Sequence, residues 1–436
     1  MAGRYPVALL LFCLLYAAGD AAADENWPQW RGPDLNGVAH AAGLPETWSE
    51  TENIIWKTAL PSWSGGTPVI WGDRIFVTSP SKAEDGAAEG GKSLLLLCLS
   101  KPDGKVLWER ELDTGNELNS KQNASSPSPV TDGTHVWAMT GTGAVAGLTM
   151  DGEILWKHNL QTDYDAFGLN FGYGASPMLY DGKIFIEVLR GMTTKEASYV
   201  VSFDGKTGNV LWRTERPTEA VLESRDAYTT PVLLRHEGKT QIIVSGGDYV
   251  TAYDPETGQE VWRAGGLNPR HTEKNRIIVS PVAVDGLVYA TSSRRPMLAV
   301  RAGGAGDVTA THVAWTWDKP NGPDVPTPAC DGVHLYLLDD RGVISCLNAK
   351  TGEVVWGPEH TASGAVSASP LLADGKVYVT NEAAVTTVLA AGPEFKKLAQ
   401  NTLNSDGRTL SSLAVSGGRI YLRTPTHLYC IGKKSH

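Results

Sequence analysis

Short apolar runs alternate with polar turns along most of the chain, and this pattern repeats. Each unit starts at a hydroxyl residue followed by proline, and two apolar runs then flank a turn that is often Asp-Gly. The starting pairs are Thr67-Pro68, Ser128-Pro129, Ser176-Pro177, Thr230-Pro231, Ser280-Pro281, Thr327-Pro328 and Ser369-Pro370. Proline is tolerated at the first residue of a strand, where no ladder donor is lost, and Asp-Gly between apolar runs indicates a hairpin. The pattern therefore predicts short β-strands joined by tight turns.

Most units end in a tryptophan that follows a glycine turn at a fixed distance. These residues are Trp108, Trp156, Trp212, Trp262 and Trp356. The prolines recur about every 50 residues, and four strands per unit at that period are typical of a propeller blade. Burying one indole in the wide part of the wedge between blades would stabilise the fold by roughly 4–6 kcal/mol before entropy. We therefore interpret these tryptophans as structural.

The two ends of the repeat complete each other. An eighth unit begins at Ser411 and stops near Cys430 without a fourth strand, while residues 53–57 look like a tryptophan strand that has no blade before it. Pairing them would close the ring and remove an exposed sheet edge. The sequence therefore predicts an all-β fold, an eight-bladed β-propeller of four-stranded antiparallel blades over residues 53–432. An N-terminal arm (24–52) precedes the propeller, and a short tail (433–436) follows it.

Composition and the N-terminal segment limit the cellular compartment and the classes of partner that the protein could have. The chain has 436 residues and a formal net charge of −10, which argues against a nucleic-acid partner. Arg4, an apolar stretch at 7–18 and small residues at 21–23 indicate a cleaved signal peptide over residues 1–23, hence a periplasmic or secreted protein. No other run is long enough for a transmembrane helix, so the mature chain is predicted to have none.

Cysteine and histidine usage gives no sign of a disulfide or a metal site. Cys98, Cys330, Cys346 and Cys430 are expected to be buried free thiols. Cys330 and Cys346 are the nearest pair, but the repeat places a strand between theirs, which is too far for a disulfide. The histidines are scattered, with no pair at metal-binding spacing.

The glycine-tryptophan motif resembles the tryptophan-docking repeat of PQQ-like β-propellers. Residues 254–262 match its Asp-x-x-Thr-Gly-x-x-x-Trp form in full, and the resemblance covers about residues 53–432. Residues 26–33 resemble the opening of secreted bacterial PQQ-binding-like propeller proteins, a group similar in fold to BamB, the outer-membrane assembly scaffold. Because one fold hosts many functions, the resemblance specifies the fold more closely than the activity.

The first functional hypothesis is a non-catalytic scaffold of the cell envelope. It would recognise a protein or glycan partner through the loops that precede the first strand of each blade, and we expect it to be a monomer. The candidate binding residues are Trp63, Asn123, Asn170, Tyr173, Arg225, Asp226, Tyr228, Arg270, Arg276 and His360. Arginine and tyrosine are favoured at interfaces, although solvated loop residues or ion pairs between blades would give the same pattern.

Two enzymatic alternatives remain open. For a PQQ-dependent alcohol or sugar dehydrogenase, the resemblance implies an adjacent cysteine pair, which this sequence lacks, and calcium ligands for which Glu223, Asn123 and Asp226 could be offered. A Cys-x-x-Cys-His haem motif is also lacking. The sequence thus supports neither PQQ nor calcium as a cofactor, but leaves a quinone in the channel open. A polysaccharide hydrolase or lyase would need two placed carboxylates, for instance Glu223 with Asp226 or Asp165.

Overall fold

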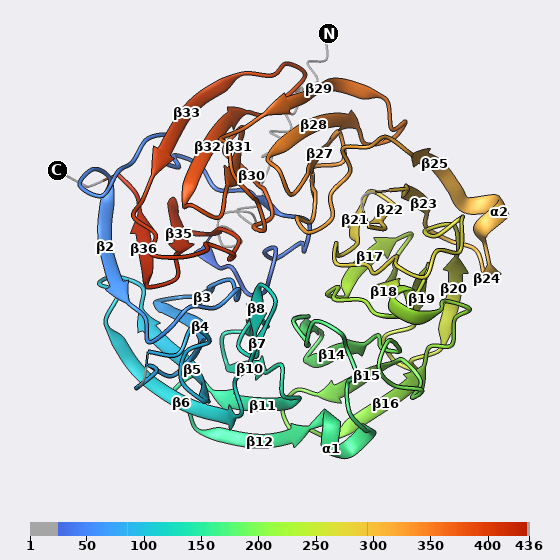
Figure 1. Ribbon diagram of the computed structural model, residues 1–436, viewed down its shortest axis with the longest axis horizontal. Coiled ribbons are helices and arrows are strands. Elements are labelled where there is room, and N and C mark those ends of the chain that lie inside the picture. Colours follow the sequence, from blue (N-terminus) through green and yellow to red (C-terminus); the bar gives the residue numbers. More distant parts are fainter. Residues whose placement is uncertain (1–24, 85, 294, 434–436) are drawn as a thin grey trace, which may run out of the picture.

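Eight radial sheets form a closed ring in the computed structural model, which describes residues 25–84, 86–293 and 295–433 (Figure 1). The predicted eight-bladed propeller is confirmed. The predicted signal peptide lies outside the described residues. Within the described ranges, no helix is long and apolar enough to cross a membrane.

Each blade has four antiparallel strands, ordered from the centre of the ring outward (Figure 1). Blade 1 is β3 (Val69–Trp71), β4 (Arg74–Pro80), β5 (Ser93–Ser100) and β6 (Val106–Thr114), and blade 2 is β9 (Val130–Thr131), β10 (His135–Met139), β11 (Ala144–Thr149) and β12 (Ile154–Asn159). Blade 3 is β13 (Met178–Tyr180), β14 (Lys183–Val188), β15 (Tyr199–Asp204) and β16 (Val210–Glu215), and blade 4 is β17 (Val232–His236), β18 (Lys239–Gly246), β19 (Tyr249–Tyr253) and β20 (Glu260–Ala264).

The second half of the ring repeats this plan. Blade 5 is β21 (Val282–Val284), β22 (Leu287–Thr291), β23 (Met297–Arg301) and β25 (Val313–Trp317), and blade 6 is β26 (Ala329–Cys330), β27 (His334–Leu338), β28 (Val343–Asn348) and β29 (Val354–His360). Blade 7 is β30 (Leu371–Ala373), β31 (Lys376–Thr380), β32 (Val385–Ala390) and β33 (Lys397–Thr402), and blade 8 is β34 (Ala414–Ser416), β35 (Arg419–Arg423), β36 (His427–Ile431) and β2 (Ile54–Ala59).

A few short elements depart from the repeat. Blades 7 and 4 each gain a parallel strand, β1 (Val38–Ala39) beside β30 and β24 (Gly306–Asp307) beside β20. A hairpin of β7 (Leu118–Asn119) and β8 (Gln122–Asn123) is inserted between blades 1 and 2. The helical elements are α1 (Leu160–Tyr164), α2 (Thr309–His312) and the 3₁₀ turn η2 (Leu222–Arg225).

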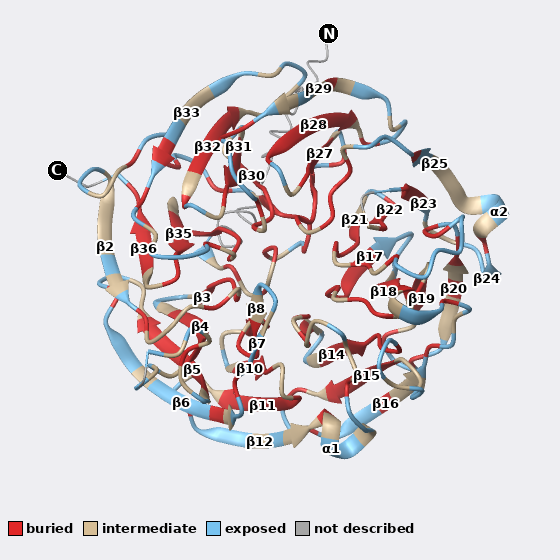
Figure 2. Cartoon of the chain, in the orientation of Figure 1, coloured by how far each residue is buried: buried red, intermediate tan, exposed pale blue. Residues whose placement is uncertain are grey.

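The N-terminal strand closes the ring, as predicted. β2 pairs antiparallel with β36, with Lys57 opposite Tyr429, so the outermost strand of the last blade comes from the start of the propeller. Figure 1 shows this seam as a blue strand beside a red one. Figure 2 shows inner strands that are mostly buried and outer strands such as β6 and β12 that face solvent.

The tryptophans lock each blade to the next through a hydrogen bond and a close contact. The indole N–H groups of Trp56, Trp108, Trp156, Trp212, Trp315 and Trp356 donate to backbone carbonyls of Lys101, Met150, Gly205, Pro255, Ala349 and Gly392 in the following blade. For every ring of this set except Trp356, the turn glycine of the following blade lies against the indole. A Cβ atom on Gly258, for example, would be 2.4 Å from Trp212, and its φ of +69° also favours glycine. These contacts agree with the structural role predicted for the tryptophans, which is to pack between neighbouring blades.

Blade 4 is an exception, because its tryptophan does not donate to the following blade. Trp262 is fully buried, but its indole donates to Gln241 Oε1 within its own blade. In blade 5 the usual glycine turn is replaced by a longer connection that carries β24 and α2. The docking partner is thus missing from blade 5, and Trp262 is satisfied locally.

The described cysteines follow the prediction. All four are buried and free. Cys330 lies in β26 and Cys346 in β28, with β27 between them.

The N-terminal arm crosses the face of the ring that carries the Asp-Gly turns. Trp27 pairs with Ile70 of blade 1, and Gln29 Oε1 accepts the Leu179 N–H of blade 3. The Arg31 guanidinium is fully buried and donates to Pro328 O of blade 6 and Pro370 O of blade 7 at 2.5 and 2.6 Å. The sequence predicted an arm but no position for it, and the structure shows that it ties distant blades together.

Candidate functional site

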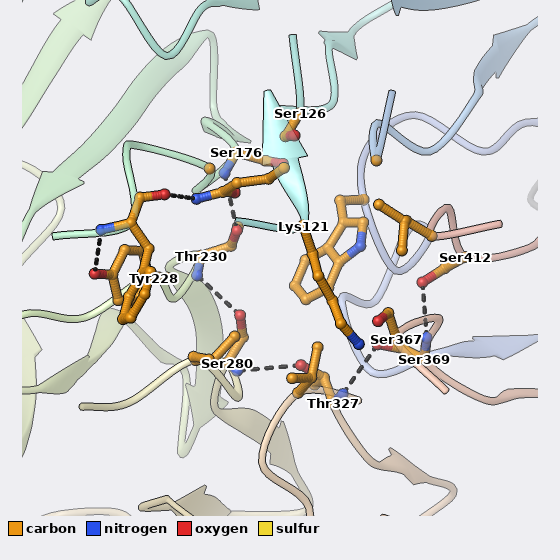
Figure 3. Close-up of a pocket in the computed structure, with 18 of the residues that line it drawn as sticks. Lys121, Ser126, Ser176, Tyr228, Thr230, Ser280, Thr327, Ser367, Ser369 and Ser412 are labelled. Atoms are coloured by element: carbon orange, nitrogen blue, oxygen red, sulfur yellow. Dashed lines mark hydrogen bonds between the residues drawn. The ribbon is translucent and has the colours of Figure 1, made fainter. Parts of the chain in front are cut away.

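A circle of hydroxyl groups surrounds the centre of the ring. In seven links, the hydroxyl that precedes a first strand accepts the backbone N–H of the equivalent residue in the preceding blade, at 2.9–3.1 Å. We call this set the hydroxyl ring, and several of its links are drawn in Figure 3. It comprises Thr67, Ser128, Ser176, Thr230, Ser280, Thr327, Ser369 and Ser412. The proline that follows most of these residues holds them in an extended conformation, which aims each N–H at the neighbouring blade.

The hydroxyl ring encloses a central cavity of about 380 Å³. The loops before the first strands of all eight blades contribute to its lining: Gly65, Ser126, Gly174, Tyr228, Arg276, Val325, Ser367 and Leu410. Trp30 of the N-terminal arm also lines it. Because the arm contacts the first strands near their Asp-Gly ends, Trp30 lies on the side of the cavity away from these loops.

The β7–β8 hairpin extends over the mouth of this cavity. Lys121 at its tip forms an ion pair with Glu382 of blade 7, with Nζ and Oε1 2.7 Å apart. Glu382 Oε1 also accepts the Ser367 hydroxyl at 2.7 Å, and Figure 3 shows Lys121 reaching across toward Ser367. Gln122 Nε2 donates to Phe171 O at 2.6 Å. The hairpin is thus tied to blades on two sides of the opening.

An aromatic and cationic cluster forms another part of the rim. The Phe171 and Tyr228 rings lie 6.2 Å apart, and the Arg276 guanidinium lies 5.4 Å from the Phe171 ring centre. Tyr228 Oη accepts the Phe171 N–H, and burial raises the pKa of this phenol above its ordinary value. Arg276 lies 3.6 Å from carboxylate oxygens of both Glu223 and Asp324. The cluster is a firm, partly apolar surface beside the cavity.

The predicted binding residues fall into four groups. Tyr228 and Arg276 line the central cavity, whereas Arg270 lies in a separate groove nearby. Trp63, Asn170, Arg225 and His360 are partly or fully exposed elsewhere. Asn123, Tyr173 and Asp226 are buried and hold the scaffold: Asn123 Nδ2 donates to Trp63 O, Tyr173 Oη donates to Glu187 O, and Asp226 accepts the N–H groups of Asn170 and Met192.

Sequence analysis gives several residues that shape the cavity no role of their own. Trp30 falls in the N-terminal arm, and Lys121 lies in the polar loop from which only Asn123 is a candidate binding residue. The hydroxyl ring left a visible signal, because serine or threonine recurs before each proline. That recurrence was used only to locate strand starts.

Three of the four side chains offered for calcium or for hydrolysis are engaged elsewhere, and the fourth, Asp165, is exposed. Glu223 lies against Arg276, Asn123 Oδ1 accepts from Ser125, and Asp226 accepts backbone N–H groups. Burial raises the pKa of Asp226. Asp165 sits at the end of α1, where its backbone carbonyl accepts from Arg190. Over the described ranges, no group of three or more His, Cys, Asp or Glu side chains could hold a metal ion.

Comparisons with known proteins place this geometry in a family. The family model described as outer membrane protein assembly factor BamB matches residues 46–170, 92–323 and 307–425. BamB of Yersinia pestis is 23% identical over 343 residues, which cover 76% of this chain and 77% of that protein. The quinohemoprotein alcohol dehydrogenase ADH-IIG of Pseudomonas putida is 31% identical over 125 residues, which cover 26% of this chain and 15% of that enzyme.

A solved structure supports the same fold. The quinohemoprotein alcohol dehydrogenase of Comamonas testosteroni superposes with a TM-score of 0.64 at 12% identity, covering 96% of this chain and 82% of that one. Such low identity carries the fold and not the activity. Because the family model matches most of the propeller, the chain belongs to the family described as outer membrane protein assembly factor BamB.

Proposed function

We propose that the protein is a non-catalytic binding scaffold of the cell envelope that holds a segment of a protein partner at the mouth of the central cavity. The observation that carries this proposal is the convergence of loops from all eight blades on one cavity, which Trp30 of the N-terminal arm also lines. Its volume of 380 Å³ is at the lower end of the roughly 300–1,000 Å³ typical of ligand sites. The cavity suits one or two inserted side chains, with the surrounding loops making further contacts.

The rim chemistry favours a protein partner over a glycan. Phe171, Tyr228 and Arg276 are in mutual contact on the loop face, and Trp30 lies within. Aromatic and arginine side chains dominate the binding energy of protein interfaces. The similarity to BamB supports both a protein partner and an envelope location.

The hydrogen bonds and ion pairs of the polar groups in the cavity favour a role in binding over a role in catalysis. A serine or threonine nucleophile needs an adjacent base to take its proton, whereas the hydroxyls of the ring accept backbone N–H groups. The cationic groups Lys121 and Arg276 are each neutralised by carboxylates. These contacts fix the geometry of the cavity, as recognition requires.

The proposal is tested by site-specific photocrosslinking in cells that produce the protein. A photoreactive amino acid replaces Phe171 on the loop face or, as the control, exposed Lys350 in the β28–β29 turn on the opposite face. We expect a discrete protein adduct at position 171 that is missing at position 350. Equal adducts at both positions, or none at either, would count against the proposal. A glycan adduct would keep the scaffold and replace the partner.

A quinoprotein dehydrogenase is the second candidate, favoured by the similarity to ADH-IIG. A planar quinone with carboxylates would need an aromatic face and free cations, for which the cavity offers Trp30, Lys121 and Arg276. Both cations are already paired with carboxylates. The calcium candidates Asn123, Glu223 and Asp226 also hold other partners. The side chains therefore fit this cofactor set poorly.

A further inference from the structure

A second groove lies where the chain passes from blade 4 to blade 5. It encloses about 560 Å³ between the loop after β20, the turn between β22 and β23, and β25. It is separate from the central cavity but shares a wall with it. Ser293 lines the groove and donates to Oδ1 of Asp324, which lines the central cavity, at 2.9 Å.

The groove is cationic on an acidic protein. Arg270, Lys274 and Arg295 line it, and Asp318 is the acidic residue among its lining side chains. All three cations are exposed, and they form no ion pair or side-chain hydrogen bond with any described residue. The chain as a whole has a net charge of −10. The groove therefore carries a local excess of positive charge, although the chain as a whole is negatively charged.

The backbone that carries these cations is held firmly. Asn268 is almost fully buried, and its Nδ2 donates to Asp248 Oδ2 and to Thr272 O at 3.1 and 3.0 Å. Its Oδ1 accepts the Thr272 N–H at 3.0 Å. Asn275, also buried, donates to Leu267 O at 3.3 Å. Arg270 and Lys274 thus project from a loop that is braced at both ends, which lowers the entropy cost of binding.

We propose that this groove is a binding site for an acidic saccharide, whose anionic groups contact Arg270, Lys274 and Arg295. The unpaired cations are donors, so the groove selects a ligand rich in acceptors. Arginine recognises carboxylate and phosphate in a bidentate manner. The volume exceeds what a single ion would fill, and Pro269 and Val313, which are both at least partly exposed, provide aliphatic surface for the carbon faces of sugar rings.

The same features disfavour an acidic peptide. A peptide backbone brings one N–H donor for nearly every carbonyl acceptor, and each donor needs a partner when it is buried. The charged side chains of the groove are donors apart from the Asp318 carboxylate. The carboxylates and ring oxygens of an acidic sugar are acceptors only, and each of its hydroxyls can accept as well as donate, so it offers the cationic donors more acceptors than a peptide does. The inference goes beyond the proposed function and does not depend on it.

The test uses calorimetric titration of the full chain with four probes. They are a linear oligosaccharide of uronic acid units, the same oligosaccharide with its carboxylates reduced to alcohols, a phosphorylated sugar and an aspartate-rich peptide. The groove variant carries Arg270→Gln, Lys274→Gln and Arg295→Gln. The matched control carries Lys206→Gln, Lys239→Gln and Lys350→Gln, three exposed cations in or directly beside turns on the opposite face. Both variants lose the same charge, and the melting temperature of each verifies folding.

We expect the wild-type chain to bind the uronate oligosaccharide or the phosphorylated sugar with an affinity that falls as salt rises. The groove variant should bind about tenfold more weakly or worse, and the control variant within about twofold of the wild type. The better of the two ligands identifies the anionic group. Equal binding by the groove variant, no binding of either anionic sugar, or binding of the neutral oligosaccharide or the peptide at the same strength would overturn the proposal. A central-cavity variant, Gln122→Ala, should leave this binding unchanged, which separates the groove from the proposed partner site.

Discussion

Replacing one turn glycine tests whether the indoles dock the blades together. In Gly258→Ala, the new methyl group would lie 2.4 Å from Trp212 at a φ of +69°. Gly182 has the same φ of +69° but no atom within 4 Å of its added Cβ, so Gly182→Ala reports the backbone strain alone. We expect that strain to cost about 1–2 kcal/mol. Displacing the indole should add about 1–3 kcal/mol, the usual cost of overpacking.

The assay is chemical denaturation followed by tryptophan fluorescence and circular dichroism, which gives the shift in the free energy of unfolding. Gly258→Ala should lower this free energy by about 2–5 kcal/mol, clearly more than Gly182→Ala. In a Trp212→Ala background the added methyl meets no ring, so its cost should fall toward that of Gly182→Ala, with a remainder from Thr214 Oγ1, which lies 2.8 Å from the same Cβ. Equal losses for the two glycine variants, or an unchanged cost without the indole, would refute docking as the reason for the glycine.

Three other changes probe the arm, a buried acid and the rim. Arg31→Met removes a buried guanidinium that donates hydrogen bonds to the carbonyls of Pro328 and Pro370. Because each acceptor left without a donor costs about 1–3 kcal/mol, the free energy of unfolding should fall by at least about 2 kcal/mol. A loss below about 0.5 kcal/mol in chemical denaturation would show that the arm does not tie the blades together. Burial raises the pKa of Glu187 to about 8. The folded state therefore keeps a proton that the unfolded state has lost between about pH 4.5 and 8, so stability should fall as pH rises through that window, and Glu187→Gln should flatten this part of a stability-against-pH profile. Arg276→Ala should reduce the crosslink yield at position 171 about fivefold or more, with the unfolding midpoint nearly unchanged, and a large loss of stability would make Arg276 a structural residue instead.

The ring could be predicted because its determinants are local and repeated. Asp-Gly turns, apolar runs and the glycine-tryptophan spacing each depend on a few neighbouring residues, and eight copies reinforce one another. The closure by β2 also followed, since Trp56 lies in a strand with no blade before it, while the last blade lacked one strand.

The binding site was less accessible to sequence reasoning because it depends on contacts between distant parts of the chain. Lys121 and Glu382 are 261 residues apart, and Arg31 reaches Pro370 across 339 residues. Polar loop residues such as Asn123 and Asp226 look like binding groups in sequence, yet both are consumed in bracing the loops. Side-chain type alone does not separate a group that holds a loop from one that faces a ligand.

The central functional claim is that this ring binds a partner and does not oxidise an alcohol. Its most direct test is a titration of the purified protein with PQQ and calcium, followed by absorbance and calorimetry, together with a dye-linked assay for alcohol oxidation. The account predicts no saturable quinone binding and no oxidation above the protein-free rate. Tight quinone binding accompanied by alcohol-dependent dye reduction would contradict it and make the dehydrogenase the better description.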